Sequence, residues 1–478
     1  MNSARIGWRA LLVVGVVVAA VLAAMLVVSA HTHAPGQGDD STTVGTRQPS
    51  SAPVHLTFGV WGSKREIATY RGIAASYHRA NPTATITLRV YPSSSALASA
   101  VKAGKVPSVY LLSRDDLGGV MRAKGNVSVQ DLMSDRGVNL GDDYSRGSLA
   151  AFTANDDLQC MPYTASPMVI YFNTDLVDVS RMRARGIDAP SPMDPSFTID
   201  QFRAAARFAA HRRGHHAAGV AIEPSLTALA PFVLSGGGNL FDDDQNPTRL
   251  AVGDGSASDA LRQTLEILRD PRLTLSDAQL RQRSALQWFE RGRVGMIAGF
   301  RDLVPQLRAV KGLHFDVLPM PILGSAATVG SFTGMCLARH QRRDLGGAAD
   351  FLTYLVGRRA MTRVAEIGSL QPADIPVAYS KAFTQPDARP AHAAVFTSTL
   401  RNIQLTPLGV PWQRLDQAVG PQLRQLMNVP VLDDLDKRLT AIDQRSKAVL
   451  SAPAASSGGA RGGSKHSARS GLKPRRGR

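Results

Sequence analysis

In residues 54–112, apolar side chains recur at two spacings, one typical of strands and one typical of helices. Apolar positions recur as in strands at 54–60, 86–90 and 108–112, and as in helices at 67–77 and around 96–103, with turn residues between them. Strands separated by helices of about 10 to 15 residues predict right-handed βαβ units. This part of the chain is therefore predicted to form a doubly wound, parallel α/β sheet.

A second pattern lies between Cys160 and Ala206 and reads strand, loop, helix, proline turn, helix. The alternating apolar run at 168–172 predicts a buried strand that ends at Asn173. Either Thr198 or Asp200 can cap a new helix. The apolar stripe of this helix consists of Phe202, Ala205, Ala206 and Ala209.

Later segments return to the same alternation. The sequence predicts a helix at 259–268, a strand at 294–298 that opens into a turn at Gly299, a strand in SFTGMCLA, and helices across 406–450. The strings PYTASPMVIYFNTDL, QWFERGRVGMIAGF, SFTGMCLA and GGAADFL with SLQP follow one another in this order.

These four strings resemble, in order, segments of family 1 extracellular solute-binding proteins, the maltose-binding-protein-like receptors of ABC importers. The resemblance covers roughly residues 54–450. It implies an α/β, two-lobed periplasmic-binding-protein-like fold of type II, in which each lobe is a doubly wound sheet and hinge strands join the lobes. It also implies that the chain crosses between the lobes near 160–167 and near 331–336.

The predicted organisation has six parts. We expect a cytoplasmic n-region at 1–10, a signal peptide or transmembrane anchor at 11–30, a linker at 31–53, lobe one at 54–162 plus 334–374, lobe two at 163–333 plus 375–450, and a disordered basic tail at 451–478. The length of the uncharged run at 11–30 suits a membrane span, while Val28-Ser29-Ala30 suits cleavage. Both readings place the remainder outside the cytoplasm, either anchored to the cell membrane or secreted.

Composition and charge exclude other classes. An apolar content of 44% is too high for a disordered chain. The formal charge of +17 arises partly in the tail, which has no acidic residue, and neither a nucleic-acid motif nor interleaved aromatics accompany it. We therefore expect no nucleic-acid partner. The tail is either a solvated end or a weak adhesive for anionic lipid or wall polymers.

The chain has two cysteines, Cys160 and Cys336. In an oxidising compartment they form either a disulfide or two buried thiols. The resemblance places them on neighbouring hinge strands, where a bridge would brace the hinge without blocking closure.

No catalytic constellation is evident in the sequence. The run 242–244 lacks the alternating ligands of a calcium loop, and Gly214 interrupts the His211, His215, His216 cluster. No nucleophile elbow or nucleotide-binding loop is present. We predict a non-enzymatic chain without cofactor or metal.

Binding residues are predicted at the carboxyl ends of strands, where open α/β sheets bind ligands. Sugars offer apolar faces and hydroxyls, which aromatic and charged side chains recognise. The resemblance implies that an Asp after the third strand, in Asp115-Asp116, holds sugar hydroxyls; the alternative is that one of these carboxylates caps the next helix. The expected ligand-binding residues are Trp61, Ser113, Asp115, Tyr163, Ser166, Phe300, Arg301 and Trp412.

Two of these positions depart from the family pattern. Arg301 occupies the place where many members have a ligand-stacking Trp, and Ser166 stands where maltose receptors carry a Glu. A bidentate Arg allows an acidic or phosphorylated ligand. The sequence thus predicts a monomeric solute-binding receptor for a sugar or sugar derivative, with ABC permease subunits as partners. The alternatives are a membrane-tethered sensor or scaffold without transport, and an extracellular carbohydrate-active enzyme.

Overall fold

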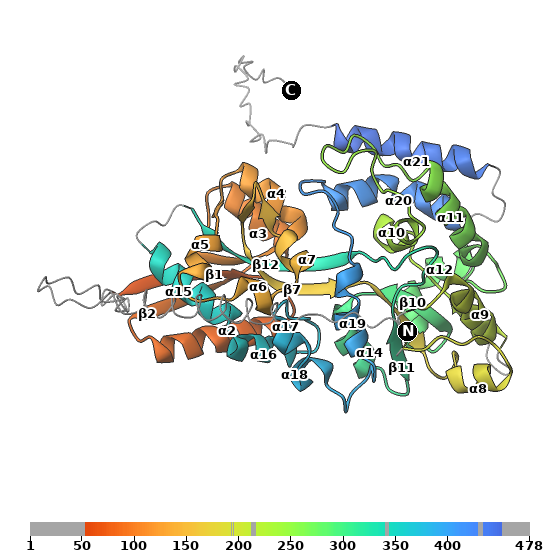
Figure 1. The fold of residues 1–478 in the computed structure, drawn as a ribbon, viewed down its shortest axis with the longest axis horizontal. Coiled ribbons are helices and arrows are strands. Elements are labelled where there is room, and N and C mark those ends of the chain that lie inside the picture. Colours follow the sequence, from red (N-terminus) through yellow and green to blue (C-terminus); the bar gives the residue numbers. More distant parts are fainter. Residues whose placement is uncertain are drawn as a thin grey trace, which may run out of the picture. The chain divides into compact units, whose positions relative to one another are not determined.

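Two β-sheets organise the chain in the computed structural model (Figure 1). The structure describes residues 53–192, 194, 196–211, 217–339, 344–428 and 434–451. The first sheet has six strands in the order β2-β1-β3-β12-β4, with β7 paired to β12. Its strands are β1 (Val54–Val60), β2 (Ala84–Val90), β3 (Val109–Ser113), β4 (Asn126–Val127), β7 (Met161–Pro167) and β12 (Gly330–Ala338).

The parallel part of this sheet follows the predicted βαβ alternation. Strand β1 pairs in parallel with β2 over its whole length and with β3 at Phe58 and Gly59. Helices α2 (Lys64–Ala80) and α3 (Ser94–Lys102) connect these strands. Ser63 begins α2 with a capping box to Glu66, and the residues predicted at helical spacing are its buried face.

The remainder of the sheet corrects the prediction of a doubly wound parallel sheet. Strand β12 runs antiparallel to β3, β4 and β7. A βαβ crossover produces parallel neighbours, but β12 arrives from the second sheet and enters in the opposite direction. Only the strands joined by local crossovers could therefore be parallel.

The second sheet has four strands in the order β11-β8-β10-β9. Strand β8 is antiparallel to both β10 and β11, while β9 is parallel to β10, so this sheet is mixed as well. Its strands are β8 (Val169–Asn173), β9 (Ala218–Val220), β10 (Val294–Gly299) and β11 (Phe315–Leu318). A separate hairpin pairs β5 (Thr153–Ala154) with β6 (Asp157–Leu158).

The two sheets are linked through β7 and β12. The chain passes from β7 directly into β8, and from β11 back into β12, and β7 and β12 pair antiparallel from Met161 to Pro167. Cys160 directly precedes β7, Cys336 lies on β12, and the two form a disulfide with 4.4 Å between their Cα atoms. The predicted crossings near 160–167 and 331–336 coincide with these strands.

Helices cover the sheets. Those associated with the first sheet include α4 (Arg114–Arg122), α5 (Gln130–Ser134), α6 (Leu140–Asp143), α7 (Arg146–Ala150), α15 (Leu345–Val356), α16 (Arg358–Ala365), α17 (Ile375–Ala378) and α18 (Lys381–Thr384). The others are α8 (Val179–Ala184), α9 (Ile199–Ala210), α10 (Leu226–Ser235), α11 (Gly255–Leu268), α12 (Asp277–Gln282), α13 (Ala285–Glu290), η1 (Arg301–Leu303), α14 (Val304–Ala309), α19 (Ala394–Ser398), η2 (Leu400–Asn402), α20 (Trp412–Asn428) and α21 (Leu435–Leu450). Thr198, and not Asp200, caps α9.

Several predictions fall on residues that the structure does not describe. The segment 11–30, the linker up to residue 52, His215, His216 and the tail after Ser451 lie outside the described residues. Within the described part of the chain, none of the helices has the length and apolar character that a membrane crossing requires.

Candidate functional site

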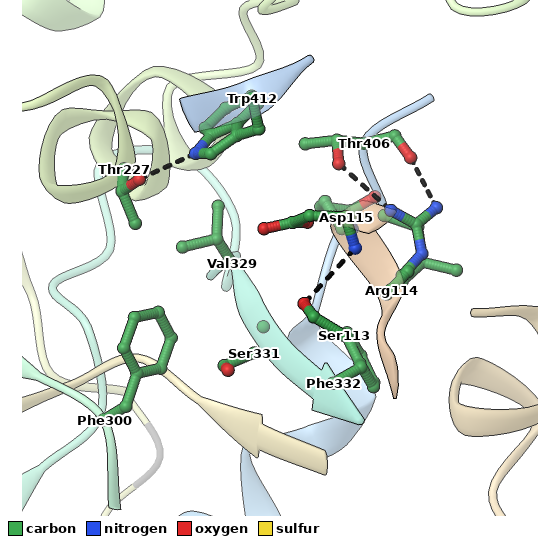
Figure 2. Close-up of a pocket in the computed structure, with 13 residues that line it drawn as sticks. Ser113, Arg114, Asp115, Thr227, Phe300, Val329, Ser331, Phe332, Thr406 and Trp412 are labelled. Carbon is green, nitrogen blue, oxygen red and sulfur yellow. Dashed lines mark hydrogen bonds between the residues drawn. The ribbon is translucent and has the colours of Figure 1, made fainter. Parts of the chain in front are cut away.

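Segments from both sheets converge on one cavity, which we term the inner cavity (Figure 2). It has a volume of about 130 Å³. Ser113 to Asp115 follow β3 of the first sheet, and Phe300 follows β10 of the second, so the cavity lies at the carboxyl ends of strands. Its lining residues are Ser113, Arg114, Asp115, Thr227, Phe300, Val329, Gly330, Ser331, Phe332, Gln404, Leu405, Thr406 and Trp412.

Hydrogen bonds fix the start of α4 on one wall of the cavity. Ser113 is the N-cap, and its Oγ accepts from the amide of Asp115 at 3.4 Å. The amide of Ser113 donates to Oγ of Ser94 at 2.8 Å, and that hydroxyl donates to Asp116 Oδ2 at 2.6 Å. Asp116 is thus engaged by its own wall, whereas Asp115 extends into the cavity in Figure 2.

The carboxylate of Asp115 combines solvent access with partial desolvation. It is an exposed side chain, yet the cavity walls surround it, and this desolvation raises its pKa, opposed by Arg114 and assisted by Asp116. A carboxylate in such a place is an acceptor for ligand hydroxyls. Asp115 is therefore positioned for polar recognition of a ligand.

Arg114 joins the α4 wall to a segment from the far end of the chain. Its Nη2 donates to the carbonyl of Thr406 at 2.6 Å and its Nη1 to Oγ1 of Thr406 at 3.2 Å (Figure 2). Its Nε donates to the carbonyl of Ala151 at 3.1 Å. The side chain is buried, and desolvation lowers its pKa. Arg114 thereby holds residues 404–406 against the cavity.

Aromatic side chains form the opposite wall. The indole N–H of Trp412 donates to Oγ1 of Thr227 at 2.8 Å, and the Trp412 ring packs edge-on against Phe241. The carbonyl of Phe300 accepts from the hydroxyl of Tyr171 at 2.6 Å, which fixes the backbone from which the Phe300 ring projects. Figure 2 shows both rings bordering the space that Asp115 enters.

A larger hollow continues the inner cavity outward, and we term it the outer cleft. It has a volume of about 950 Å³ and shares Ser113, Asp115 and Trp412 with the inner cavity. Trp61 lies on its wall, with its indole N–H bonded to the carbonyl of Leu111 at 2.9 Å. Together the two spaces reach the size typical of small-ligand sites, about 300 to 1,000 Å³.

The family model described as "Bacterial extracellular solute-binding protein" matches residues 72–391. The chain belongs to this family. No curated protein sequence matches it. The match includes both crossings and the first wall of the inner cavity, while Trp412 lies beyond it.

Solved structures of other proteins have the same fold as this solute-binding protein. An ABC substrate-binding protein of Listeria monocytogenes in complex with cycloalternan has a TM-score of 0.68 at 14% identity, covering 83% of this chain and 99% of that one. The GacH receptor of Streptomyces glaucescens, solved unliganded and in complex with acarbose, has a TM-score of 0.66 at 14% identity, covering 83% of this chain and 99% of that one. The cyclic α-maltosyl-1,6-maltose binding protein of Arthrobacter globiformis has a TM-score of 0.67 at 15% identity, covering 84% of this chain and 99% of that one. At these identities the likeness establishes the periplasmic-binding-protein-like fold.

The structure brings together five of the eight predicted ligand residues. Ser113, Asp115, Phe300 and Trp412 line the inner cavity, and Trp61 lines the outer cleft.

Tyr163, Ser166 and Arg301 do not line either space and correct the prediction. Tyr163 has an exposed fraction of 0% and packs against Tyr70 in the core of the solute-binding protein, where burial raises its pKa. Ser166 is buried and accepts the amide of Arg301 at 3.0 Å.

Arg301 also has an exposed fraction of 0%, so it cannot grip a ligand anion in this arrangement. Its Nε donates to the carbonyl of Gly368 at 2.9 Å and its Nη2 to that of Phe383 at 3.0 Å. The guanidinium also lies over the rings of Phe383 and Phe396, and desolvation lowers its pKa to about 10. At neutral pH it is a buried cation held by carbonyls and aromatic faces.

Sequence reasoning missed four polar residues of the inner cavity: Thr227, Ser331, Gln404 and Thr406. Thr227 lies in the first turn of α10 just after its Ser225 cap, and this N-terminal position was the one signal available for it. Gln404 and Thr406 belong to an irregular segment that distant contacts bring to the cavity: Arg114 donates to the carbonyl of Thr406, and the amide of Gln404 donates to the carbonyl of Thr328 at 2.8 Å.

Proposed function

We propose that this protein is the extracytoplasmic receptor of an ABC importer and binds a sugar or sugar derivative between its two sheets. The observation that carries the proposal is the meeting of the Asp115 carboxylate with the Trp412 and Phe300 rings in one cavity. A sugar presents apolar C–H faces and a rim of hydroxyls. Aromatic rings pack on the faces, and a carboxylate accepts from the hydroxyls at about 1.5 to 3 kcal/mol per bond.

The ligands of proteins with the same fold support this proposal. The three described above were solved with, or are named for, cycloalternan, acarbose and a cyclic maltosyl-maltose, all oligosaccharides. A maltose-bound protein of Thermotoga maritima has the same fold at a TM-score of 0.64 and 14% identity.

Closure of two lobes would couple binding to transport. We place lobe one at 54–162 plus 334–374 and lobe two at 163–333 plus 375–450. Because Ser113 and Asp115 follow a strand of one sheet, and Trp412 and Phe300 belong to the other side, a ligand that contacts all four favours the closed state. The closed form would dock on permease subunits. Residues 11–30 would anchor the receptor to the outer face of the cell membrane, or cleavage near Ala30 would release it.

Calorimetry with a panel of neutral, acidic and phosphorylated mono- and oligosaccharides tests the proposal. We expect at least one sugar to bind with micromolar affinity, equivalent to about 8 kcal/mol, and X-ray scattering to show compaction. If no sugar in the panel binds or changes the scattering, the proposed function is wrong.

Two variants connect any binding to the inner cavity. Asp115→Asn removes a charged acceptor and should weaken the affinity by about 10- to 100-fold. The matched control is Asp131→Asn, an exposed carboxylate in the first turn of α5 that does not line either space. Equal effects of the two substitutions on affinity would show that Asp115 does not bind the ligand.

A further inference from the structure

Three cations line the outer cleft from both sides. Lys102 is the last residue of α3 and Arg122 the last residue of α4, both on the side of the first sheet, while Arg414 lies in the first turn of α20. All three side chains are exposed, and within the described residues none of them has a carboxylate within ion-pair distance. This end of the cleft is a concentration of uncompensated positive charge.

The surroundings of three glycines show where the Lys102 and Arg122 side chains lie. A Cβ added at Gly119 would lie 3.8 Å from Nζ of Lys102, and a Cβ added at Gly118 would lie 3.5 Å from Nη1 of Arg122. A Cβ at Gly409 would lie 3.1 Å from the same Nη1, and a Cβ at Gly118 would lie 2.7 Å from Cα of Gly409. Lys102 therefore lies by Gly119 of α4, and Arg122 lies where the backbone of Gly409 packs directly on this helix.

The carboxylates of the same cleft lie at its other end. Asp115 and Asp116 are in the first turn of α4, and Ser94 Oγ donates to Asp116. Arg122 follows Asp115 by seven residues of helix, and Lys102 follows Ser94 by eight, which at a rise of 1.5 Å per residue separates the two ends by about 10 to 12 Å. The cleft thus has an acidic, aromatic inner end and a basic outer end.

We propose that the ligand is an anionic saccharide, whose carboxylate or phosphate group lies at the outer end of the cleft by Lys102 and Arg122, with Arg414 adding positive charge from α20. This proposal rests on the proposed function and specifies the ligand class. Guanidinium groups bind carboxylate and phosphate in bidentate geometry, and a cleft concentrates the attraction. The separation of the two ends exceeds a single sugar ring, so the anion is carried at least one unit from the ring that meets Asp115 and Trp412.

Matched ligand pairs test the charge preference by calorimetry at about 50 mM salt, where screening is weak. The probes are maltotriose against its terminal monophosphate, and trigalacturonate against its neutral methyl ester. We expect the charged member of at least one pair to bind at least tenfold more tightly. If sugars bind but neither pair shows a preference, the anionic ligand is excluded while the receptor function stands. If neither pair nor any neutral sugar binds, both proposals fail.

Variants test the assignment of residues. The triple change Lys102→Gln, Arg122→Gln and Arg414→Gln should reduce the preference to less than threefold without loss of neutral-sugar binding. The control is Lys105→Gln with Arg424→Gln, which removes exposed charge just beyond α3 and on α20 but outside the cleft. Arg414→Gln alone provides a milder variant if the triple change folds poorly. A preference that survives the triple change overturns the assignment.

Discussion

The backbone amide of Arg301 donates to the hydroxyl of Ser166 across 3.0 Å, which ties the end of β10 to the crossing strand β7. The same residue sends its buried guanidinium to the carbonyls of Gly368 and Phe383. Its neighbour Phe300 faces the inner cavity. Arg301 is thus a structural anchor directly behind a residue of the site.

Replacing Arg301 should destabilise the fold. In Arg301→Met the carbonyls of Gly368 and Phe383 lose their side-chain donor, and we expect a loss of about 3 kcal/mol in the free energy of unfolding, measured by urea denaturation. The exposed control Arg424→Gln should change it by less than about 0.5 kcal/mol. Equal stabilities of the two variants would contradict the role of Arg301 as an anchor.

The disulfide should contribute to stability through the length of chain it closes. Cys160 and Cys336 are 176 residues apart, and the chain-entropy relation gives up to about 5 kcal/mol for such a loop. We expect the double variant Cys160→Ala and Cys336→Ala to lose about 4 kcal/mol, and to become insensitive to dithiothreitol. Since neither cysteine lines the cavity, sugar affinity should stay within threefold of the parent.

Asp443 should impose a pH dependence on stability. It has an exposed fraction of 4%, accepts the amides of Val252 at 3.0 Å and Gly253 at 2.9 Å, and desolvation raises its pKa from 3.8 to about 6. Because the native state holds this proton up to about pH 6 and the unfolded state loses it near pH 4, stability falls as pH rises between these values, by up to about 3 kcal/mol.

Chemical denaturation at pH 4.5, 5.5 and 6.5 measures this effect against Asp443→Asn, which cannot titrate. As pH rises, the free energy of unfolding of the parent should fall relative to that of the variant. Parallel profiles of the two proteins would contradict the raised pKa of Asp443.

Trp412 should contribute to ligand affinity more than a tryptophan outside the site. Trp412→Ala removes the ring that faces Asp115, and we expect an affinity loss of about tenfold or more by calorimetry. Trp288 is also half-buried, with its indole N–H bonded to the carbonyl of Gln279 at 3.0 Å, but it lies outside both spaces. Trp288→Ala should therefore leave affinity unchanged, and similar losses in both would contradict the placement.

Local periodicity was sufficient for the elements of the first sheet. The helix predicted across 67–77 has the buried face that its spacing indicated, because burial of an amphipathic stripe decides such a segment. Strand direction was not predictable in the same way. The antiparallel entry of β12 depends on the second sheet from which the chain returns, about 160 residues after the first crossing, and no local pattern records it.

Site residues at strand ends were predictable, and residues that depend on distant partners were not. Ser113 ends β3, and Asp115 and Phe300 closely follow β3 and β10, so the strand pattern together with the family resemblance predicted their place. Arg301 was predicted to face ligand because it occupies the place where many family members have a ligand-stacking Trp, but the carbonyls of Gly368 and Phe383 make its burial possible. Those carbonyls lie on segments that the sequence does not connect to Arg301.

Hydrogen–deuterium exchange with and without a saturating sugar tests the central claim most directly. If the ligand lies between the two sheets, peptides covering 111–118 and 404–415 should gain protection together, since they carry Ser113, Asp115 and Trp412 on facing walls. Peptides of α8 and α9, which are remote from both spaces, should be unchanged. Protection of only one wall, or protection confined to segments that line neither space, would contradict binding in the cleft between the sheets.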